Sequence, residues 1–364
     1  MSVYIHIPFC NSICTYCDFC KIYYNKKYVM RYLDSLRKEI EERYNDEEVS
    51  TIYIGGGTPT CLDDEELKEL MKITKLFNVK NKIEFTIEGN IESITENKLK
   101  IMKEYGVNRI SIGVQSFNDN VIKLLGRKHN KNEVFSKIKL VKKYFDNINI
   151  DLIYAAYEDT DILKEDINNF LFLDIPHIST YSLIIEDNTI LKIKGYKNIN
   201  EDLDYEMYSY IEKTLEENNY IHYEISNYAK KGYESRHNLV YWNNDFYYGF
   251  GLSSTSFINN KRRINTKNLT KYLDDNYLDK EVYEDKKVRM ENEVMLGLRK
   301  LSGIDLNNFR YKYNYDLENV FNIDELIRDG YLIIEDNYLR INKKYIYISN
   351  EILLRIFDWQ IFDD

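Results

Sequence analysis

Residues 1–20 read MSVYIHIPFCNSICTYCDFC, a stretch that contains four of the five cysteines of the chain. Cys10, Cys14 and Cys17 follow a C-x3-C-x2-C spacing directly after the apolar run Val3–Ile7. Close cysteine spacings of this kind hold iron–sulfur clusters in proteins. We therefore predict a loop that holds a metal centre at the C-terminal end of the first strand.

Other roles for these cysteines fit the sequence less well. A structural zinc site remains the main alternative, but it normally needs a second Cys or His pair about 12–20 residues further on, and none is present there. A disulfide framework suits small secreted domains, whereas we expect this 364-residue chain to lack a signal peptide. Core packing is a common role for free cysteine, yet polar residues surround these four.

The stretch Tyr4-Ile-His-Ile-Pro-Phe-Cys10, with C-x3-C-x-Tyr-C, resembles the radical S-adenosylmethionine (SAM) superfamily. It is most similar to the branch that contains oxygen-independent coproporphyrinogen III oxidase and the radical SAM heme chaperones. The resemblance implies that Cys10, Cys14 and Cys17 hold a [4Fe–4S] cluster and that SAM binds the fourth iron. That iron has no protein ligand, just as a catalytic zinc ion keeps one coordination position for its substrate. Cys20 fits neither relative's pattern, so we expect it to be a non-ligand.

Composition limits the classes of function. The chain has 50 Lys and Arg against 60 Asp and Glu, a net charge of −10 that disfavours nonspecific binding to nucleic acid. Apolar runs such as Tyr181–Ile185 are far shorter than the roughly 20 residues of a membrane-spanning helix. We expect a cytoplasmic protein with reduced thiols and no membrane span.

The first half of the chain alternates between strand and helix patterns, which predicts an α/β fold with parallel strands and right-handed crossovers. An open sheet and a barrel both satisfy this pattern; the resemblance implies a six-stranded partial (β/α) barrel over residues 1–187. The predicted strands are Val3–Ile7, Thr51–Ile54, Ile83–Glu88, Arg109–Gly113, Asn149–Ile153 and Ile178–Leu183. The predicted helices are Tyr28–Tyr44, Asp63–Leu76, Thr95–Tyr105, Asn132–Tyr144 and Thr160–Phe172.

Two further units are expected after the barrel. Residues 188–287 form an α+β accessory domain in this interpretation, entered through a charged linker near residues 186–202. Its loop around Gly249–Ser256 resembles a family element that closes over the barrel mouth. Residues 288–364 are predicted to form a small helical, winged-helix-like unit because helices there precede a short hairpin. The acidity of the chain argues against DNA binding by this unit.

Unusual residues follow several predicted strands at their C-terminal ends, where parallel barrels assemble their sites. Each alone has a simpler explanation, such as a surface carboxylate or a solvated charge, but their recurrence at one edge favours a site. Ile91 replaces the proline of the family pattern after strand three, and Ala155-Ala156 stand where the family usually has Gly-x-Pro, which puts the wall after strand five in doubt. By resemblance, the SAM-binding residues are Tyr4, Tyr16, Gly56, Gly57, Thr58, Glu88, Gln115, Arg127 and Asp151.

The stretch from His237 to Trp242 matches the H-N-x-x-Y-W block of the chaperone branch. An imidazole among aromatic rings suits an axial heme ligand; the alternative is a histidine satisfied by loop hydrogen bonds. The resemblance implies a heme-binding protein that delivers heme to client hemoproteins and needs an electron donor for its cluster. By resemblance, the oxidases carry a long extension before this tyrosine, whereas three residues precede Tyr4 here, so we expect the chaperone and keep the oxidase as the second interpretation. A radical SAM enzyme with another substrate is the third.

Overall fold

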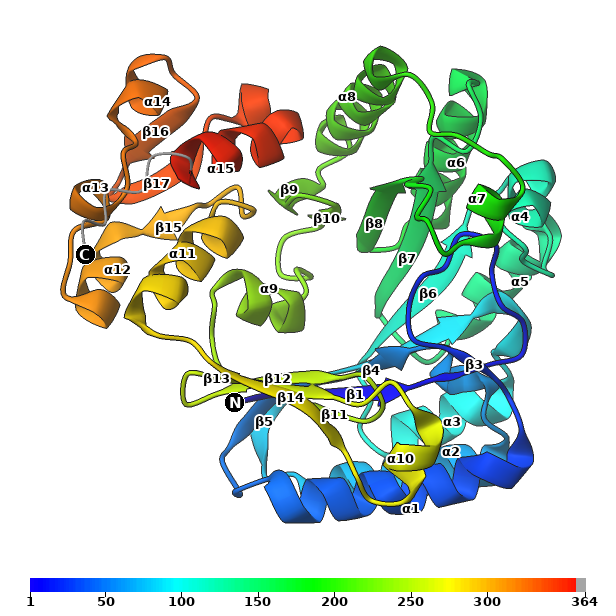
Figure 1. Cartoon of the computed structure of the whole chain (residues 1–364). Coiled ribbons are helices and arrows are strands. Elements are labelled where there is room, and N and C mark those ends of the chain that lie inside the picture. The colour runs from blue at the N-terminus through cyan, green and yellow to red at the C-terminus, as the bar shows by residue number, and fades with distance from the viewer. Residues whose placement is uncertain (358–364) are drawn as a thin grey trace.

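A computed structural model describes residues 1–357, so residues 358–364 of the predicted C-terminal unit lie outside it. Six parallel strands form the centre of a single twelve-stranded sheet, which confirms the predicted α/β fold and its parallel strands (Figure 1). In sheet order the strands are β14 (Leu278–Tyr283), β13 (Lys261–Asn265), β12 (Thr255–Ile258), β11 (Tyr247–Phe250), β1 (Ser2–Ile7), β4 (Val49–Gly56), β5 (Val79–Asn90), β6 (Arg109–Gln115), β7 (Asn147–Tyr154), β8 (His177–Ser182), β10 (Asn227–Ala229) and β9 (Ile221–Glu224).

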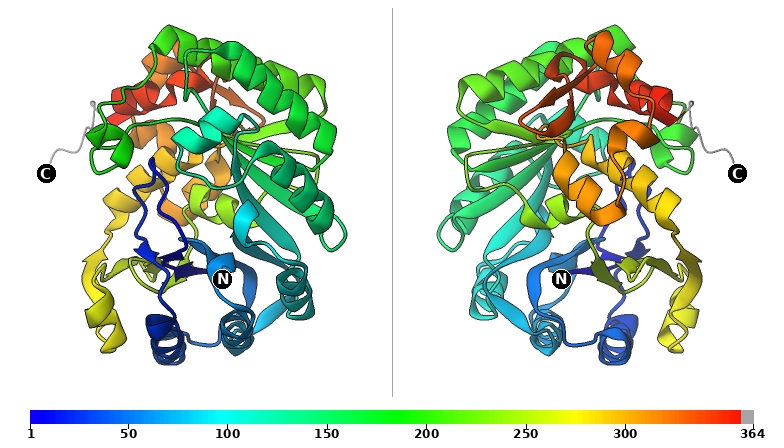
Figure 2. Two further views of the ribbon diagram at one scale, coloured as in Figure 1. Left: turned by 90° about the vertical axis from the view of Figure 1, so that its right-hand side faces the viewer. Right: turned by 90° about the vertical axis from the view of Figure 1, so that its left-hand side faces the viewer.

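Helices that connect the parallel strands cover the outer face of the curved sheet, and its inner face remains open to a cavity (Figure 2). They are α1 (Lys26–Arg43), α2 (Asp64–Ile73), α3 (Glu96–Glu104), α4 (Asp119–Leu124), α5 (Lys131–Val141) and α6 (Thr160–Leu173). Among residues 1–357, no helix combines the length and the apolarity needed to cross a bilayer.

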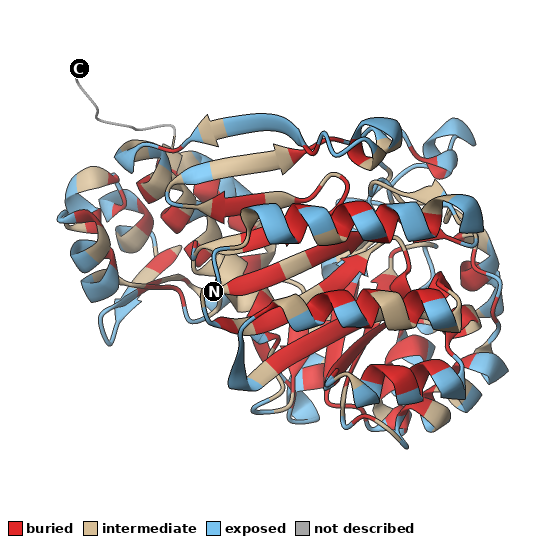
Figure 3. Cartoon of the chain, turned by 90° about the horizontal axis from the view of Figure 1, so that it is seen from below, coloured by how far each residue is buried: buried red, intermediate tan, exposed pale blue. Residues whose placement is uncertain are grey.

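Helix α1 illustrates how the sequence pattern determines the packing. Its predicted apolar face, Val29, Leu33, Leu36 and Ile40, is buried, as the 3.6-residue period indicates. Figure 3 shows these outer helices with buried stripes toward the sheet and exposed faces toward solvent. The helix begins after Asn25, whose side chain accepts a hydrogen bond from a backbone amide of the first turn.

The region 188–287, expected as an accessory domain, adds its strands to the same sheet. Strand β11 pairs in parallel with β1, and β10 pairs antiparallel with β8, so both edges of the six-stranded unit are covered. Unpaired edges expose backbone donors and acceptors, which explains why the sheet continues across the predicted boundary. The helices of this region are α7 (Ile190–Ile193), α8 (Glu201–Glu217), α9 (Arg236–Trp242) and α10 (Leu269–Leu273).

The expected loop around Gly249–Ser256 also differs from the structure. Its first residues belong to strand β11 and its last to β12, so the segment lies within the sheet and does not line the cavity at the barrel mouth. Gly249 is required there because a Cβ would lie 2.1 Å from the carbonyl oxygen of Thr255.

The C-terminal unit has a hydrophobic core of its own, separate from that of the barrel. A small antiparallel sheet in the order β15-β17-β16 packs with helices, in agreement with the helices and hairpin expected from the sequence (Figure 1). Its elements are α11 (Lys286–Gly297), β15 (Ile304–Asp305), α12 (Leu306–Tyr313), α13 (Leu317–Val320), α14 (Asp324–Arg328), β16 (Leu332–Glu335), β17 (Tyr338–Ile341) and α15 (Ser349–Phe357).

A buried carboxylate connects α1 to the strands that follow the barrel. Glu39 is fully buried, and it accepts hydrogen bonds from Tyr272 Oη at 2.6 Å, Asn265 Nδ2 at 2.6 Å and the Gly251 amide at 2.9 Å. Arg43 on the next turn of α1 forms an ion pair with it. Glu39 therefore fixes the β11–β13 region against the N-terminal helix.

We expect Glu39→Ala to lower the free energy of unfolding by about 3 kcal/mol, because the partly buried Arg43 and three buried donors lose this acceptor. Urea titration followed by circular dichroism measures the loss. Glu41→Ala, at an exposed position of the same helix, should change the free energy by less than about 0.5 kcal/mol. Similar losses in both variants would contradict this role for Glu39.

Candidate functional site

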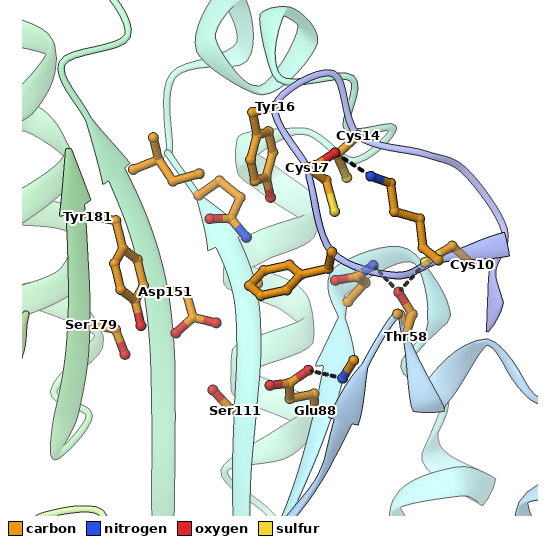
Figure 4. Close-up of a pocket in the computed structure, with 18 of the residues that line it drawn as sticks. Cys10, Cys14, Tyr16, Cys17, Thr58, Glu88, Ser111, Asp151, Ser179 and Tyr181 are labelled. Atoms are coloured by element: carbon orange, nitrogen blue, oxygen red, sulfur yellow. Dashed lines mark hydrogen bonds between the residues drawn. The ribbon is translucent and has the colours of Figure 1, made fainter. Parts of the chain in front are cut away.

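A cavity of about 460 Å³ opens at the C-terminal ends of β4 to β8, between these strands and the loop that contains the cysteines (Figure 4). Its lining includes most of the residues predicted from the sequence. These are Cys10, Cys14, Tyr16, Cys17, Gly56, Gly57, Thr58, Glu88, Gln115, Arg127 and Asp151.

The cysteine loop is held at both ends and in its middle. Two short strands, β2 (Phe9–Cys10) and β3 (Ile22–Tyr23), pair with each other and close the loop at its base. In the middle, the Thr15 amide donates to Leu125 O at 3.1 Å, and its hydroxyl donates to Leu124 O at 2.7 Å. These contacts position the loop over the end of α4.

The three predicted cluster ligands lie on the cavity side of this loop. Cys10 Sγ lies 3.6 Å from Thr58 Oγ1, and burial raises the pKa of the Cys10 thiol to about 11. Among residues 1–357, no three Cys, His, Asp or Glu side chains are already close enough together to hold a metal ion. Three thiols from one loop nevertheless match the donor set of a [4Fe–4S] cluster. Cys20 does not line the cavity.

Tyr4 lies behind the loop and does not line the cavity. Its hydroxyl donates to His6 Nδ1 at 3.0 Å, and His6 Nε2–H donates to the Cys20 carbonyl at 2.8 Å. Burial lowers the pKa of His6 to about 4, so the ring is neutral and makes both hydrogen bonds. In this structure Tyr4 supports the end of the cysteine loop.

Glu88 lies at the end of β5 and points into the cavity (Figure 4). Its two carboxylate oxygens accept hydrogen bonds from Tyr53 Oη at 2.7 Å and from the Gly56 amide at 3.1 Å. Burial raises the pKa of Glu88 to about 7 although these hydrogen bonds oppose the shift. Gly55 makes room for it, since a Cβ there would lie 2.7 Å from the Glu88 carboxyl carbon.

Arg127 and Gln115 form the wall from β6 and the segment after α4. Arg127 is buried, and no residue among 1–357 accepts a hydrogen bond from its Nε. A Cβ at Gly113 would lie 2.3 Å from Arg127 Nη2, so this glycine provides the space that the guanidinium occupies. Gln115 has a φ of 70° at an irregularity in β6. Backbone strain of this kind often occurs at functional sites.

Asp151 on β7 lies across the cavity from Glu88 (Figure 4). Asn149 Nδ2 donates to its carboxylate at 2.8 Å, and burial raises its pKa. Ala155, which departs from the pattern expected by resemblance, has a φ of 62°, a left-handed conformation that favours glycine. The segment that follows β7 therefore begins with an alanine in a strained conformation.

His237 is placed outside the cavity, under β4. It is 1% exposed, and its ring stacks on Tyr53 with centroids 5.2 Å apart. Both ring nitrogens are bonded, Nδ1 to Thr51 Oγ1 and Nε2 to Tyr241 Oη, each at 2.8 Å. In this conformation both nitrogens are hydrogen-bonded, to a strand residue and to a residue of the same helix and not to loop residues as the alternative expected.

Several cavity residues were missed from the sequence, among them Tyr53, Arg109, Ser111, Asn149 and Ser179. They occupy alternate positions of the barrel strands and face inward. Polar residues at a period of two in strands that otherwise read as apolar are a signal that could have identified them.

Comparisons with known proteins support the site. A family described as the radical SAM superfamily matches residues 4–171, and one described as the HemN C-terminal domain matches residues 285–344. The heme chaperone HemW of Lactococcus lactis is 38% identical over 343 residues, which cover 91% of this chain and 90% of that protein. The chain belongs to the HemW family of radical SAM proteins. The family implies SAM and a [4Fe–4S] cluster.

Other relatives agree with this assignment. The HemW protein of Bacillus subtilis is 38% identical over 336 residues, which cover 88% of this chain and 89% of the relative. The crystal structure of coproporphyrinogen III oxidase (HemN) from Escherichia coli superposes with a TM-score of 0.84 at 21% identity, covering 97% of this chain and 89% of that one. This similarity establishes a fold shared with HemN.

We expect the affinity for SAM to rise between about pH 6 and pH 8, because Glu88 ionises near pH 7 and its carboxylate attracts the cationic groups of SAM. Glu88→Gln should weaken binding by about 1–3 kcal/mol and flatten this pH dependence. Isothermal titration of the anaerobic, cluster-loaded protein measures both effects.

Glu186→Gln is the matched control, because Glu186 also lines the cavity but is exposed. This variant should keep the wild-type pH profile. A profile that persists in Glu88→Gln would show that another group controls the binding.

Proposed function

We propose that this chain binds a [4Fe–4S] cluster through Cys10, Cys14 and Cys17, binds SAM in the adjoining cavity, and carries heme to client hemoproteins. The observation that carries the proposal is a single cavity that is lined by three thiols of one loop together with Glu88 and Arg127. An external electron donor would reduce the cluster.

The side chains of the cavity suit SAM in charge and shape. The cluster supplies one-electron chemistry when bound. Glu88 offers a carboxylate for the cationic groups of SAM, and the Arg127 guanidinium, whose Nε has no acceptor among residues 1–357, offers hydrogen bonds for its carboxylate. The backbone at Gly56 and Gly57 allows close approach of the ligand, since glycine has no Cβ.

The proposal of heme as cargo rests on the relatives named heme chaperones and on the rim of the cavity. Phe19, Tyr181 and Ile184 are 67%, 43% and 61% exposed and line the cavity from opposite sides. Exposed apolar side chains around a cavity indicate an apolar ligand or partner. A flat macrocycle with an apolar body fits this rim.

His237 is the proposed axial ligand. To bind heme iron, its ring has to leave at least one hydrogen bond, to Thr51 or to Tyr241. Burial lowers the pKa of His237 to about 3, so the ring is already neutral, as metal binding requires. Heme binding through His237 therefore requires a change of its hydrogen bonds, not a change of protonation.

Oxygen-independent coproporphyrinogen III oxidase is the second candidate function. The fold that this chain shares with HemN over nearly its whole length favours it. The greater identity with proteins named heme chaperones favours the first candidate.

We expect Cys14→Ala to lose the cluster, because three thiolates are needed to hold it, and Cys20→Ala to keep it, because Cys20 does not line the cavity. Anaerobic reconstitution followed by iron determination and EPR spectroscopy of the reduced protein tests both variants. An intact cluster in Cys14→Ala, or loss of the cluster in Cys20→Ala, would contradict the assignment of the three ligands.

Heme should bind to the purified protein and give a Soret band distinct from that of free hemin. His237→Ala removes the proposed ligand and should weaken binding. Tyr241→Phe removes the hydrogen bond that competes for Nε2, so it should strengthen binding about 2- to 10-fold. Unchanged titrations in both variants would mean that His237 has only a structural role.

The oxidase is tested in the same preparations. Anaerobic incubation with SAM, a reductant and coproporphyrinogen should give no protoporphyrinogen. Stoichiometric product without a specific heme spectrum would replace the chaperone with the oxidase.

A further inference from the structure

Arg109 is a buried cation that forms no hydrogen bond and no ion pair within residues 1–357. It is 2% exposed. Its Nε has no hydrogen-bond partner, and no residue in this described range forms an ion pair or a hydrogen bond with its guanidinium. The residue nevertheless lines the cavity.

A buried guanidinium is normally paired, because removing its charge from water is costly unless acceptors replace the water. The nearby carboxylates are bonded elsewhere: Glu88 to Tyr53 and the Gly56 amide, and Asp151 to Asn149. Their charges interact with Arg109 over a longer distance. The guanidinium itself is thus available to a ligand that enters the cavity.

The position of Arg109 on β6 places it at the floor of the cavity. Arg109, Ser111 and Gly113 are alternate residues of one strand, so their side-chain positions share the inward face. Gly113 lies beside the Arg127 guanidinium and pairs in register with Asp151, and Ser111 pairs in register with Glu88. Arg109 is one step of about 7 Å further along the strand from the mouth.

Two other polar groups at the cavity surface are uncommitted. The side-chain amide of Asn238 has no hydrogen-bond partner among residues 1–357, and Asn238 lines the cavity from α9. The Ser111 hydroxyl accepts from Asn149 Nδ2 at 2.8 Å, but its own O–H has no acceptor in the same range. Arg109, Asn238 and Ser111 therefore offer hydrogen-bond donors and no negative charge.

We propose that Arg109, with Ser111 and Asn238, forms a carboxylate-binding subsite at the floor of the cavity, which takes a propionate side chain of the porphyrin. The proposal rests on the proposed heme function. SAM has one carboxylate, for which Arg127 at the mouth is available, so the second unpaired guanidinium calls for a second acid. Arginine binds carboxylates through two parallel hydrogen bonds, which a neutral ester cannot reproduce.

Soret titrations with heme and with heme dimethyl ester, in anaerobic protein loaded with cluster and SAM, test this subsite. The wild type should bind heme about 5- to 150-fold more tightly than the diester. The Arg109→Gln variant should bind heme only as tightly as it binds the diester. Its affinity for the diester should equal that of the wild type. Equal affinities for heme and diester in the wild type would overturn the proposal, as would discrimination retained in Arg109→Gln.

Two further variants guard against a folding defect at Arg109. The side chain of Asn238 makes no hydrogen bond within residues 1–357, so the Asn238→Ala variant should fold normally. It should still lose part of the preference for heme over the diester. Arg31→Gln is the matched control, since Arg31 is 58% exposed and lies 4.0 Å from Asp274. It should discriminate as the wild type does. Full discrimination in Asn238→Ala would remove this residue from the subsite.

A porphyrin-independent arm separates this subsite from the heme function. Saturation-transfer NMR with sodium propionate should give a signal with the wild type and none with Arg109→Gln, and propionamide should give none with either. If heme does not bind but propionate behaves in this way, the heme function fails and the carboxylate subsite stands. If heme binds but propionate and the diester show no dependence on Arg109, the subsite fails and the heme function stands.

Discussion

The parallel pairing of β1 with β4 determines where the chemistry of this protein takes place. Ser2 to Ile7 run beside Thr51 to Gly56 in one register, so the segments that follow both strands leave the sheet at the same edge. One of these segments holds the cysteines and the other the glycines. Any slip of this register would separate the thiols from the walls of the cavity.

The charged side chains inside the barrel are removed from water but only partly paired with one another. Two guanidiniums line one cavity with the carboxylates of Glu88 and Asp151, which are held by hydroxyl and amide donors, while the Nε atoms of both guanidiniums have no acceptor among residues 1–357. Such an arrangement is unfavourable for an empty protein and favourable for one that binds anionic ligands, because ligand acceptors then satisfy the cations. We read the cavity as shaped for its ligands at some cost in stability.

Much of the fold was predictable because its signals are local. The α1 apolar stripe and the alternation of strands and helices follow directly from residue periodicity, and every predicted barrel strand overlaps an observed one. The choice of a barrel over an open sheet came from family resemblance. Strands β9 to β14 were not predicted, since short strands at sheet edges are specified by distant partners more than by their own residues.

The site shows the same division. The cysteine spacing and the residues after the barrel strands lie in short motifs, which sequence alone can identify. Arg109 is a single residue inside an apolar strand, and only its burial without a partner draws attention to it. The contacts of His237 could not be foreseen, because Thr51 and Tyr53 belong to a strand far away in sequence.

The pairing of β1 with β11 has a consequence for how the protein is made. Val3 to Ile5 lie beside Tyr248 to Phe250. The strand that precedes the cysteine loop therefore gains its second neighbour only from β11, which is far away in the sequence. Contacts so distant in sequence form late and slowly, and domains fold as units while the chain leaves the ribosome. The cysteines are therefore synthesised early but reach their final positions late. We expect cluster insertion to follow the synthesis of most of the chain. During that interval the thiols lack their final surroundings and are open to oxidation.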